Sequence, residues 1–475
     1  MSDRHRDAIV DGSITRTLVV LAVPLVAQNV VRVAQHVVDT FWLGRLGETA
    51  VSAVGLSIPV LGLVFALLAT PFVGTQILVS QRVGADGGEG AARRTVVHGV
   101  VLAGVGGVVV GGAVALGAGS LVRLVGAGPA VAPPAAVYLS TVALGLPVAG
   151  MSDAVEAGFV GVGDSRASLW INVATVAVNV VLDPLFIFGF GPVPGMGVRG
   201  AALATVAGYL AGFLLAAALA VGPRMDLSPR AHGLSVAEFR ALLDVGAPAT
   251  GRQVVRRSVR VLLVGVVAVA GGAAGLAAYT VGARVASVAV LPSQGLRQAA
   301  QSMVGQNVGA DRPARAGRTT RVGVGVAVVS LSVLGVVQWA APAALARTFV
   351  PDLSGDGFAL TVDYLRVLAY GYPAIGAVDL LLAGFNGASR TRTSFVVDLL
   401  KYWAVRLPAA ALALPASASV SVLGVSLVPG MDLGMPAVFW AVTGSNVLAA
   451  VGVAAYYARE LRAGLFVGAA ESASD

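Results

Sequence analysis

Two stretches of the chain, "GMSDAVEAGFVGVGDSRAS" at residues 150–168 and "GAVDLLLAGFNGASRTRTS" at residues 376–394, are copies of one motif. Aligned at a shift of 226 residues, they have the same amino acid at eight positions, among them Asp153 with Asp379. A match of this length within one chain indicates an internal repeat.

Two shorter matches extend the repeat toward the N-terminus. At a shift of 225, "QRVGAD" (81–86) aligns with "QNVGAD" (306–311), and at a shift of 224 Pro24 aligns with Pro248. All the matches occur in the same order and at nearly the same shift. The sequence therefore predicts that the chain is a duplication of one structural unit.

The composition places both copies in a lipid bilayer. The chain is 57% hydrophobic and only 12% charged, with a mean hydropathy of +0.85, whereas soluble proteins carry about 25% charged residues. A membrane-spanning helix needs about 20 apolar residues. Apolar stretches of at least this length are found at 17–43, 51–79, 96–122, 134–162, 167–190, 199–222, 242–270, 274–304, 322–346, 361–388, 394–424 and 436–458.

These stretches predict an all-α membrane protein with twelve transmembrane helices, six in each copy. Because six is even, both copies enter the membrane from the same side. They are then parallel repeats about an axis along the membrane normal, an arrangement typical of transporters that work by alternating access. We therefore expect two six-helix lobes around a central cavity, with the N-terminal lobe at 1–230 and the C-terminal lobe at 231–475.

The arginines predict the orientation. They are dispersed along the chain, which argues against a nucleic-acid surface. With the N-terminus inside, the inner loops and tails collect most of the loop arginines, and the outer loops hold only Arg45, Arg123, Arg199 and Arg347. We therefore expect a multi-pass protein of the cell membrane with both termini in the cytoplasm. The chain has no cysteine, so disulfides and thiolate chemistry are excluded.

Polar residues in the apolar stretch "NVATVAVNVVLDP" (172–184) form the first candidate site. Asn172, Asn179 and Asp183 are spaced by seven and four residues, so a helix places them on one face. Pro184 cannot donate a backbone hydrogen bond and therefore frees a carbonyl one turn earlier. A lone carboxylate in such a segment is expensive and indicates a functional group.

A second polar stripe runs along the first predicted helix, at Gln28, Arg32, Gln35 and Asp39. Both helices run outward, so Asp39 and Asp183 lie at similar depth and are expected to face each other. Two close carboxylates favour capture of a proton, and carboxylate, amide and carbonyl oxygens together suit a hard cation such as Na⁺. Gln35, Asn172, Arg32 and His36 are accessory candidates. The alternative is structural: Arg32 pairs with Asp39, and Asn179 only joins helices.

The segments "GVGDSRASLWINVATVAVNVVLDPLFIFG", "GVRGAALAT" and "VVDTFWLGRLG", with the paired "VGAD" loops, resemble the multidrug and toxic compound extrusion (MATE) family over about residues 15–460. The resemblance implies export of organic cations and drugs in exchange for H⁺ or Na⁺. In the prokaryotic branch with a coupling site in the N-terminal lobe, it implies that Asp39, Asn179, Asp183 and Thr205 bind the coupling ion.

The second copy departs from this pattern. The counterparts of Asp39, Asn179 and Asp183 are Leu263, Val405 and Ala409. The seventh predicted helix, "GRQVVRRSVRVLLVG", instead carries four arginines. We expect Asp379 and Asp398 to pair mainly with basic residues. The candidates for the substrate cavity are Asp379, Asp398, Tyr138 and Tyr279.

Two other functions are compatible with parts of the sequence. A flippase for lipid-linked substrates of the same superfamily needs a cationic cavity for a phosphate headgroup, which the arginine-rich seventh helix favours. An intramembrane prenyl transferase needs paired aspartates in a loop to hold Mg²⁺ on a diphosphate, and the sequence has no such pair. We therefore expect no enzyme, no cofactor or resident metal, no nucleic-acid partner, and a monomer in the lipid bilayer that transports small organic cations.

Overall fold

The computed structural model describes residues 3–222, 224–225, 233–351, 354–422 and 425–467. In this part of the chain nearly every long element is a helix, because most segments are apolar and a helix satisfies its own backbone groups in lipid. The helices of the first half are α1 (Asp3–Val10), α2 (Ile14–Leu46), α3 (Glu48–Leu67), α4 (Ala69–Gly84), α5 (Glu89–Leu124), α6 (Ala132–Leu144), α7 (Leu146–Val162), α8 (Ser165–Phe188) and α9 (Val198–Val221).

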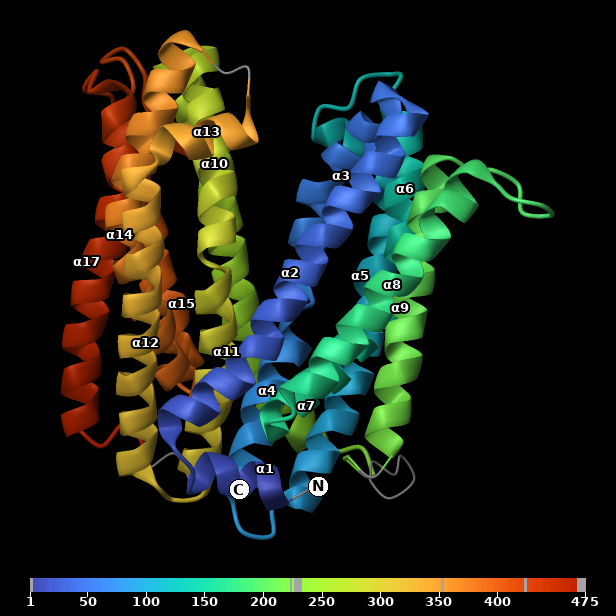
Figure 1. Ribbon diagram of the computed structural model, residues 1–475, viewed down its shortest axis with the longest axis vertical. Coiled ribbons are helices and arrows are strands. Elements are labelled where there is room, and N and C mark those ends of the chain that lie inside the picture. The colour runs from blue at the N-terminus through green and yellow to red at the C-terminus, as the bar shows by residue number, and fades with distance from the viewer. Residues whose placement is uncertain (1–2, 223, 226–232, 352–353, 423–424, 468–475) are drawn as a thin grey trace. The chain divides into compact units, whose positions relative to one another are not determined.

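The second half continues the pattern (Figure 1). Its elements are α10 (Val236–Ala289), α11 (Leu291–Gly309), α12 (Pro313–Ala340), α13 (Pro342–Phe349), α14 (Gly355–Gly387), α15 (Thr391–Leu399), the π-helix η2 (Leu400–Arg406), α16 (Leu407–Ala411), the strands β1 (Ser419–Val422) and β2 (Val425–Pro429), and α17 (Gly434–Arg462). The two strands form a short antiparallel hairpin, and the all-α class predicted from the sequence is confirmed.

The chain forms two compact units. The first takes in the described residues up to Thr250 together with Gly305–Arg312, and the second takes in Gly251–Val304 and the described residues from Pro313 onward. The repeat boundary at 230/231 remains a prediction about the duplication. The first compact unit extends past this boundary to Thr250, because the start of α10 is bound to it.

This attachment is polar. Glu238 in the first turn of α10 pairs with Arg82 of α4, with 3.0 Å between Arg82 Nη2 and Glu238 Oε2. Thr95 of α5 donates to Glu238 Oε1 at 2.9 Å. The backbone N–H of Ser235 donates to Nε2 of His98 at 2.8 Å. The start of α10 is thus held by α4 and α5.

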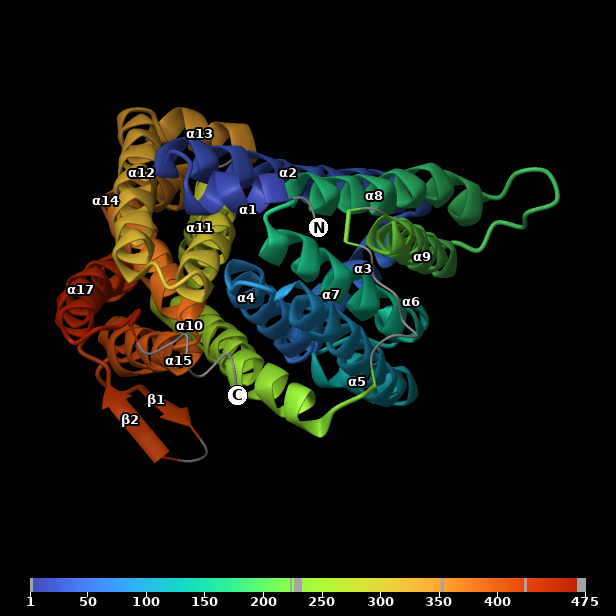
Figure 2. The ribbon, with the colours of Figure 1, turned by 90° about the horizontal axis from the view of Figure 1, so that it is seen from below.

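In the first unit, α2 and α8 lie side by side, and α9 packs along α8 (Figures 1 and 2). The helix pair α6 and α7 is bent by 47°. A buried apolar cluster that includes Leu139, Leu146 and Ile187 joins these helices at one end, and a second cluster around Phe159 and Ile171 joins α4, α5, α7, α8 and α9. The apolar packing leaves the polar faces of α2 and α8 turned toward each other.

In the second unit, α10, α12, α14, η2, α16 and α17 surround a buried cluster that includes Tyr364, Tyr372 and Phe439. As one straight helix, the 54 residues of α10 would be about 80 Å long, far more than the hydrocarbon core of about 30 Å. Gly272 breaks the helix with φ 55° and ψ −147°, a backbone conformation that favours glycine. This one element therefore supplies the seventh predicted span and leads into the eighth.

The predicted spans can be traced through these elements. Within the described residues, nine helices are long and apolar enough to cross a membrane, and ten if α6 and α7 count as one span. The break in α10 and the division of the eleventh predicted span among α15, η2 and α16 account for the difference from twelve. The predicted architecture of twelve transmembrane helices in two lobes is confirmed.

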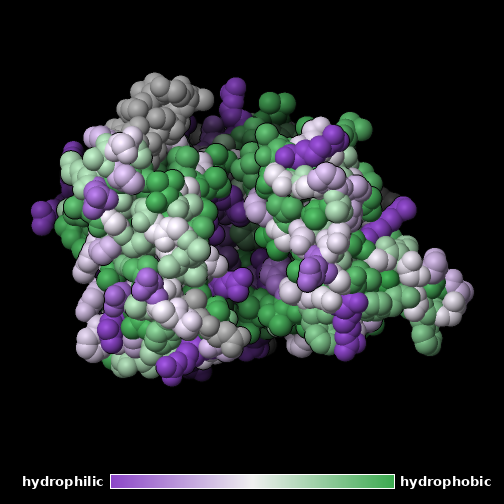
Figure 3. Space-filling view, turned by 90° about the horizontal axis from the view of Figure 1, so that it is seen from above, coloured by the Kyte–Doolittle hydropathy of each residue, from purple (hydrophilic) through white to green (hydrophobic). Residues whose placement is uncertain are grey.

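The surface agrees with this assignment. Leu116, Val181 and Val329 are among many large apolar side chains that lie exposed on the outer faces of long helices. In the end-on view of Figure 3, hydrophobic side chains cover much of each unit and hydrophilic ones form small separate groups. Such a surface is stable against lipid, whereas a soluble protein rarely exposes apolar patches of this extent.

The two copies of the "QxVGAD" motif pack against each other within the first unit. A Cβ atom on Gly84 would lie 2.0 Å from the carbonyl oxygen of Gln306, and one on Gly309 would lie 1.7 Å from the carbonyl oxygen of Gln81. Gln81 and Gln306 are repeat counterparts, as are Gly84 and Gly309. The contact is therefore reciprocal, as across a two-fold axis.

Candidate functional site: a carboxylate pair in the first unit and a cationic cavity in the second

Asp39 of α2 and Asp183 of α8 come together in the first unit, as the sequence predicts. Their carboxyl groups lie in hydrogen-bonding contact. Asp183 is buried, and its Oδ2 atom receives no hydrogen bond from a donor group in the described part of the chain. A second carboxylate cannot donate one unless one of the pair carries a proton. The pair is therefore built to take up a proton or a cation.

Asn179 lies one helical turn before Asp183 and connects the pair to its surroundings. Its side-chain nitrogen lies 3.5 Å from both Asp183 Oδ1 and Thr205 Oγ1, and Gln35 donates to its oxygen at 2.7 Å. With the amide turned over, the nitrogen donates to Asp39 Oδ1 at 3.1 Å and the oxygen accepts from the backbone N–H of Thr205 at 3.2 Å. The side-chain amide of Asn179 therefore lies within 3.5 Å of a carboxylate oxygen of each aspartate.

Two further predicted residues border this group. Thr205 of α9 donates to the carbonyl oxygen of Ala201 at 3.0 Å, and its hydroxyl is hydrogen-bonded to that of Tyr138. Tyr138 is buried in the first unit, so it does not belong to the same cavity as Asp379, Asp398 and Tyr279. It forms part of the wall around the carboxylate pair instead.

His36 and Arg32 lie on the same helix as Asp39 but differ in their contacts. His36 is exposed one turn before Thr40, to which its carbonyl oxygen is bonded at 2.7 Å. Arg32 does not pair with Asp39 in this structure. Its Nη2 lies 3.7 Å from Glu156 Oε1, and its Nε donates to Asn172 Oδ1 at 2.6 Å. The structural alternative of an Arg32–Asp39 pair is therefore wrong.

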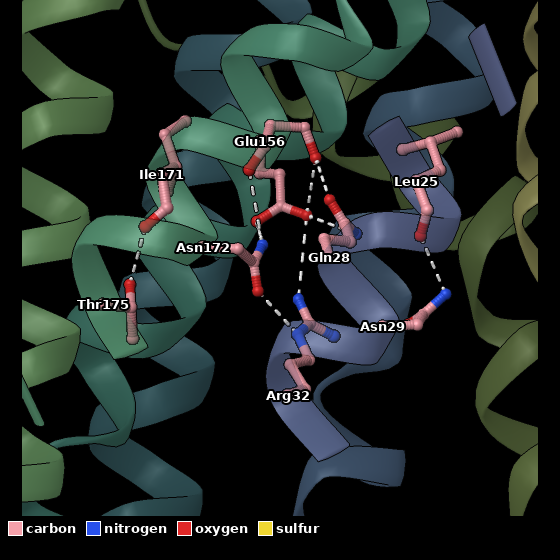
Figure 4. A network of polar contacts seen from close by, with 9 residues as sticks. Leu25, Gln28, Asn29, Arg32, Glu156, Ile171, Asn172 and Thr175 are labelled. Atoms are coloured by element: carbon pink, nitrogen blue, oxygen red, sulfur yellow. Dashed lines mark hydrogen bonds and ion pairs between the residues drawn. The ribbon is translucent and has the colours of Figure 1, made fainter. Parts of the chain in front are cut away.

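Glu156 of α7 is the centre of a second polar network (Figure 4). Its Oε2 accepts from Nδ2 of Asn172 at 2.7 Å, and its Oε1 accepts from Ser168 at 2.9 Å and from Gln28 at 3.2 Å. Ser168 donates to Gln28 Oε1 at 2.7 Å as well. All four partners, Arg32 included, are neutral or cationic donors from α2 and α8, so the network binds α7 to both helices.

The sequence argument missed Glu156 and did not single out Asp153. Asp153 interacts electrostatically with both Glu156 and Arg32. The signal is present in the repeated motif, where "DAVE" places two acidic residues three positions apart in an apolar helix. Residues at this spacing share a helix face, and ionisable groups inside a membrane segment are functional candidates by default.

The local sequence explains the position of α8. Asp164 caps its N-terminus by accepting from the backbone N–H of Ala167 at 3.1 Å, and Nη1 of Arg224 pairs with the other oxygen of Asp164 at 2.8 Å. A capping aspartate stabilises a helix start by about 1 kcal/mol. From this fixed start, Asn172, Asn179 and Asp183 recur on the buried face of α8.

A cavity of about 410 Å³ lies in the second unit. Its volume is within the range of pockets for small organic ligands. Asp379, Asp398 and Tyr279 line it, as the sequence predicts. Seven basic residues line it too: Arg252, Arg256, Arg257, Arg260, Arg297, Lys401 and Arg406.

Both carboxylates of this cavity are engaged. Nε of Arg252 donates to Asp398 Oδ2 at 2.9 Å, and both side chains are largely buried. Ser293 donates to Asp379 Oδ2 at 2.7 Å. Asp398 therefore pairs with a basic residue as predicted, whereas Asp379 accepts from a serine. Two carboxylates leave five positive charges without a matching negative charge in the lining.

The donor sets differ between the units. Among the described residues, there is no group of three or more His, Cys, Asp and Glu side chains that could hold a metal ion. The oxygens of Asp39, Asn179, Asp183 and Thr205 suit a hard monovalent cation or a proton, which would be cargo rather than a resident metal. The second unit offers guanidinium groups, which suit anions.

The MatE family matches residues 24–185 and 248–412, which is more than half of the chain and falls once in each repeat. Two curated relatives are similar over most of their length. The chain is 24% identical over 420 residues to the FAD transporter of Shewanella oneidensis, covering 87% of this chain and 90% of that protein. It is 28% identical over 455 residues to the probable multidrug resistance protein NorM of Pseudomonas aeruginosa, covering 91% and 87%.

Solved structures share the fold. A MOP superfamily transporter from Pyrococcus furiosus, described as having a binding pocket of reverse polarity, superposes with a TM-score of 0.86 at 22% identity and covers 96% of this chain and 98% of that chain. The family match over both repeats and the agreement of the folds lead to one conclusion. The chain belongs to the MatE family, and it is a multi-pass membrane transporter rather than an enzyme.

Proposed function

We propose that this chain is a secondary active exporter of small molecules, driven by H⁺ or Na⁺ that binds between Asp39 and Asp183. The observation that carries the proposal is the contact between these two carboxyl groups, one of which has a buried oxygen without a donor. The similarity of the chain to the probable multidrug resistance protein NorM of Pseudomonas aeruginosa supports the export of several different compounds.

The carboxylate pair couples ion binding to a change of state through its charge. When both groups are ionised, they repel each other and hold polar groups such as Asn179 and Gln35 around them. A bound proton or Na⁺ cancels part of this charge, so α2 and α8 approach more closely. The two states bind the ion with different affinities, which is the requirement for a ligand to shift a conformational equilibrium. We infer that alternating access of the two lobes follows from this change.

The orientation follows from the arginines of the loops, which favour cytoplasmic termini. In a cell-membrane protein placed in this way, both carboxylates lie toward the outer ends of their helices and take up the ion from outside. Release inside then returns the empty carrier. An ion gradient directed into the cell therefore drives export of the cargo.

The cargo expected from the family resemblance, an organic cation, finds acidic groups in the first unit at Asp39, Asp153, Glu156 and Asp183, whereas basic residues outnumber Asp379 and Asp398 in the second-unit cavity. A second candidate, export of anionic molecules, is favoured by the charge of the second-unit cavity. The FAD transporter of Shewanella oneidensis is a relative named for an anionic cargo. A flippase for lipid-linked phosphates falls under the same candidate.

The test of the proposed function is a transport assay in vesicles. Purified protein is reconstituted, and efflux of a fluorescent dye is followed under a pH gradient and separately under a Na⁺ gradient. We expect one of the two gradients to drive efflux, and Asp39→Asn to abolish it. Asp363→Asn is the matched control, because Asp363 is an exposed aspartate in the second unit. Equal efflux with and without either gradient would overturn ion coupling.

A further inference from the structure

We propose that the second-unit cavity binds an anionic ligand that carries phosphate or diphosphate groups. This names the cargo class of the proposed exporter and rests on that function for its role, but the binding itself needs no transport. Seven basic side chains and two carboxylates line the cavity, and one basic group, Arg252, pairs closely with Asp398. Five positive charges then have no matching carboxylate in the lining, and the surrounding lipid cannot solvate them.

The first part of the lining is a row of guanidinium groups on α10. Arg252, Arg256 and Arg260 are spaced by four residues, so they point from the same face over about 12 Å of helix. Arg256 and Arg260 are exposed into the cavity, and neither has a carboxylate within 4.0 Å among the described residues. Guanidinium groups bind phosphate oxygens through paired hydrogen bonds.

The second part of the lining comes from the π-helix η2. In an α-helix, residues five apart point in directions about 140° apart. A π-helix bonds residue i to residue i+5, and this brings Lys401 and Arg406 to the same side. Both groups lie over the ring of Tyr402, with Lys401 Nζ at 5.2 Å and Arg406 Cζ at 4.5 Å from its centroid. The irregular segment therefore places two positive charges in one cavity.

These charges are fixed by the surrounding structure. Nε of Arg406 donates to Ser445 at 2.9 Å, and its Nη2 donates to Asn446 Oδ1 at 2.9 Å. Neutral partners orient Arg406 without cancelling its charge. The Nε atom of Arg257 is buried and has no hydrogen-bond partner in the described part of the chain. A ligand with several anionic oxygens would satisfy it.

The duplication shows that most of these basic positions are not basic in the first copy. At the shifts that align the repeats, Arg252, Arg256 and Arg260 correspond to Gln28, Arg32 and His36, and Lys401 and Arg406 correspond to Thr175 and Val180. Three of the five basic positions are therefore uncharged in the first unit, whereas Arg256 has an arginine as its counterpart. The shared fold does not require the added charges, because the first copy folds without them.

The cavity also offers flat aromatic surface beside the charges. Tyr279 lines it and stacks on Tyr364 with ring centroids 5.9 Å apart, and Tyr402 lines it among the basic groups. A phosphate attached to a ring system, as in a nucleotide, matches both features. A diphosphate headgroup of a lipid shares the charged part only, so the two sources are distinguishable by experiment.

Binding to the full-length protein in phosphatidylcholine nanodiscs tests the proposal, with no ion gradient present. The probes are inorganic pyrophosphate, ADP, a prenyl diphosphate carried in the bilayer, and tetraphenylphosphonium as a cation of opposite charge. We expect pyrophosphate to bind and its affinity to fall with added salt. Tighter binding of ADP than of pyrophosphate identifies a soluble nucleotide-like ligand, and tighter binding of the prenyl diphosphate identifies a lipid headgroup.

Variants connect the binding to the cavity. Arg256→Gln combined with Arg260→Gln should raise the dissociation constant of the best-bound anion at least 10-fold, and Arg260→Lys should give a smaller rise because the charge remains. Arg366→Gln, at an exposed arginine of α14, is the matched control and should change nothing. Thermal melting of each variant shows whether it is folded, and the Arg260→Lys arm keeps the test decisive if the double variant does not fold.

Three results would overturn the site: no binding of any of the three anions, equal binding by the double variant, or loss of tetraphenylphosphonium binding in that variant. Asp183→Asn separates the site from the export function. We expect this variant to bind the anion as the wild type does. A protein that binds the anion yet exports nothing under either gradient would refute the export function and leave the site standing.

Discussion

The carboxyl groups of Asp39 and Asp183 contact each other between α2 and α8, toward the outer ends of two largely apolar helices. Each is the acidic residue of its own helix face. The contact makes the charge of one group depend on the state of the other, which is the property a coupling site needs.

The first prediction follows from this pair. Asp183→Asn is permanently neutral at this position and keeps the shape of the side chain, so the variant should fold but remain as if loaded. We expect active dye efflux to be abolished, dye binding to be retained, and the dependence of binding on pH or Na⁺ to disappear. Dye affinity at acidic and alkaline pH, with and without Na⁺, checks this.

Asp39→Asn should behave in the same way, because the two groups act as one site. A variant that still pumps against a gradient would show that the pair is structural and that coupling occurs elsewhere.

The second prediction concerns the buried network of Glu156. Leucine in place of Glu156 removes the acceptor for Gln28, Ser168 and Asn172 and leaves Arg32 without its partner. Breaking a buried charge network of this kind costs about 3 kcal/mol or more. We expect Glu156→Leu to lower the apparent melting temperature markedly.

Glu156→Gln serves as the comparison for this variant, since an amide keeps part of the hydrogen bonding. It should destabilise the protein less than leucine does. Equal melting temperatures for wild type and Glu156→Leu would contradict a stabilising network.

The third prediction distinguishes the two aspartates of the cavity. Asp398 is buried and paired with Arg252 at 2.9 Å, so Asp398→Asn leaves a buried positive charge uncompensated and should destabilise by about 3 kcal/mol. Asp379 accepts from Ser293, a bond that asparagine preserves in part. Asp379→Asn should therefore melt close to the wild type.

Neither change removes a residue of the ion site, so both folded variants should keep gradient-driven efflux. Efflux is measured under whichever gradient drives the wild type. Complete loss of gradient dependence in Asp379→Asn would place part of the coupling in the second unit.

The fourth prediction tests the reciprocal contact of the repeated motifs. An alanine at Gly84 or Gly309 places a methyl group within 2.0 Å or 1.7 Å of a backbone carbonyl oxygen of the other motif. A backbone group cannot rotate away, so each substitution should destabilise by about 1–3 kcal/mol, by similar amounts because the two positions are equivalent. Gly325→Ala is the control, since a Cβ there meets nothing within 4 Å.

A comparison of melting temperatures for the three alanine variants decides this prediction. Loss of stability in Gly325→Ala as large as that in Gly84→Ala would mean that helix glycines, rather than the motif contact, carry the effect.

Much of the architecture follows from sequence because one physical requirement dominates. A helix in lipid must be apolar for about 20 residues, so the spans are visible as apolar runs, and the spacing of Asn179 and Asp183 places them on one face. The same reasoning cannot find breaks that depend on backbone geometry. The apolar run of α10 gives no sign that Gly272 is the residue that leaves helical dihedral angles.

Pairing between helices was predicted less well, because it depends on rotation about each helix axis and on which partner is nearer. Arg32 lies on the same stripe as Asp39, yet α7 brings Glu156 within 3.7 Å of it. A π-helix is likewise invisible in the residue pattern, so the grouping of Lys401 with Arg406 could not be deduced from a spacing of five. Tyr138 borders the carboxylate pair and does not line the cavity that Tyr279 lines, a difference that the sequence did not show because aromatic residues carry no periodic signal of their own.

The reciprocal packing of Gly84 on Gln306 and of Gly309 on Gln81 has an evolutionary meaning. Before the duplication, a half-length chain had one such glycine and one such glutamine, and two copies of it could have made this same contact as a homodimer with two-fold symmetry. Fusion into one chain keeps the contact and removes the obligation that both halves be identical. An ancestor bound by symmetry had the same charge on both sides, whereas the fused protein was free to become acidic in one half and basic in the other.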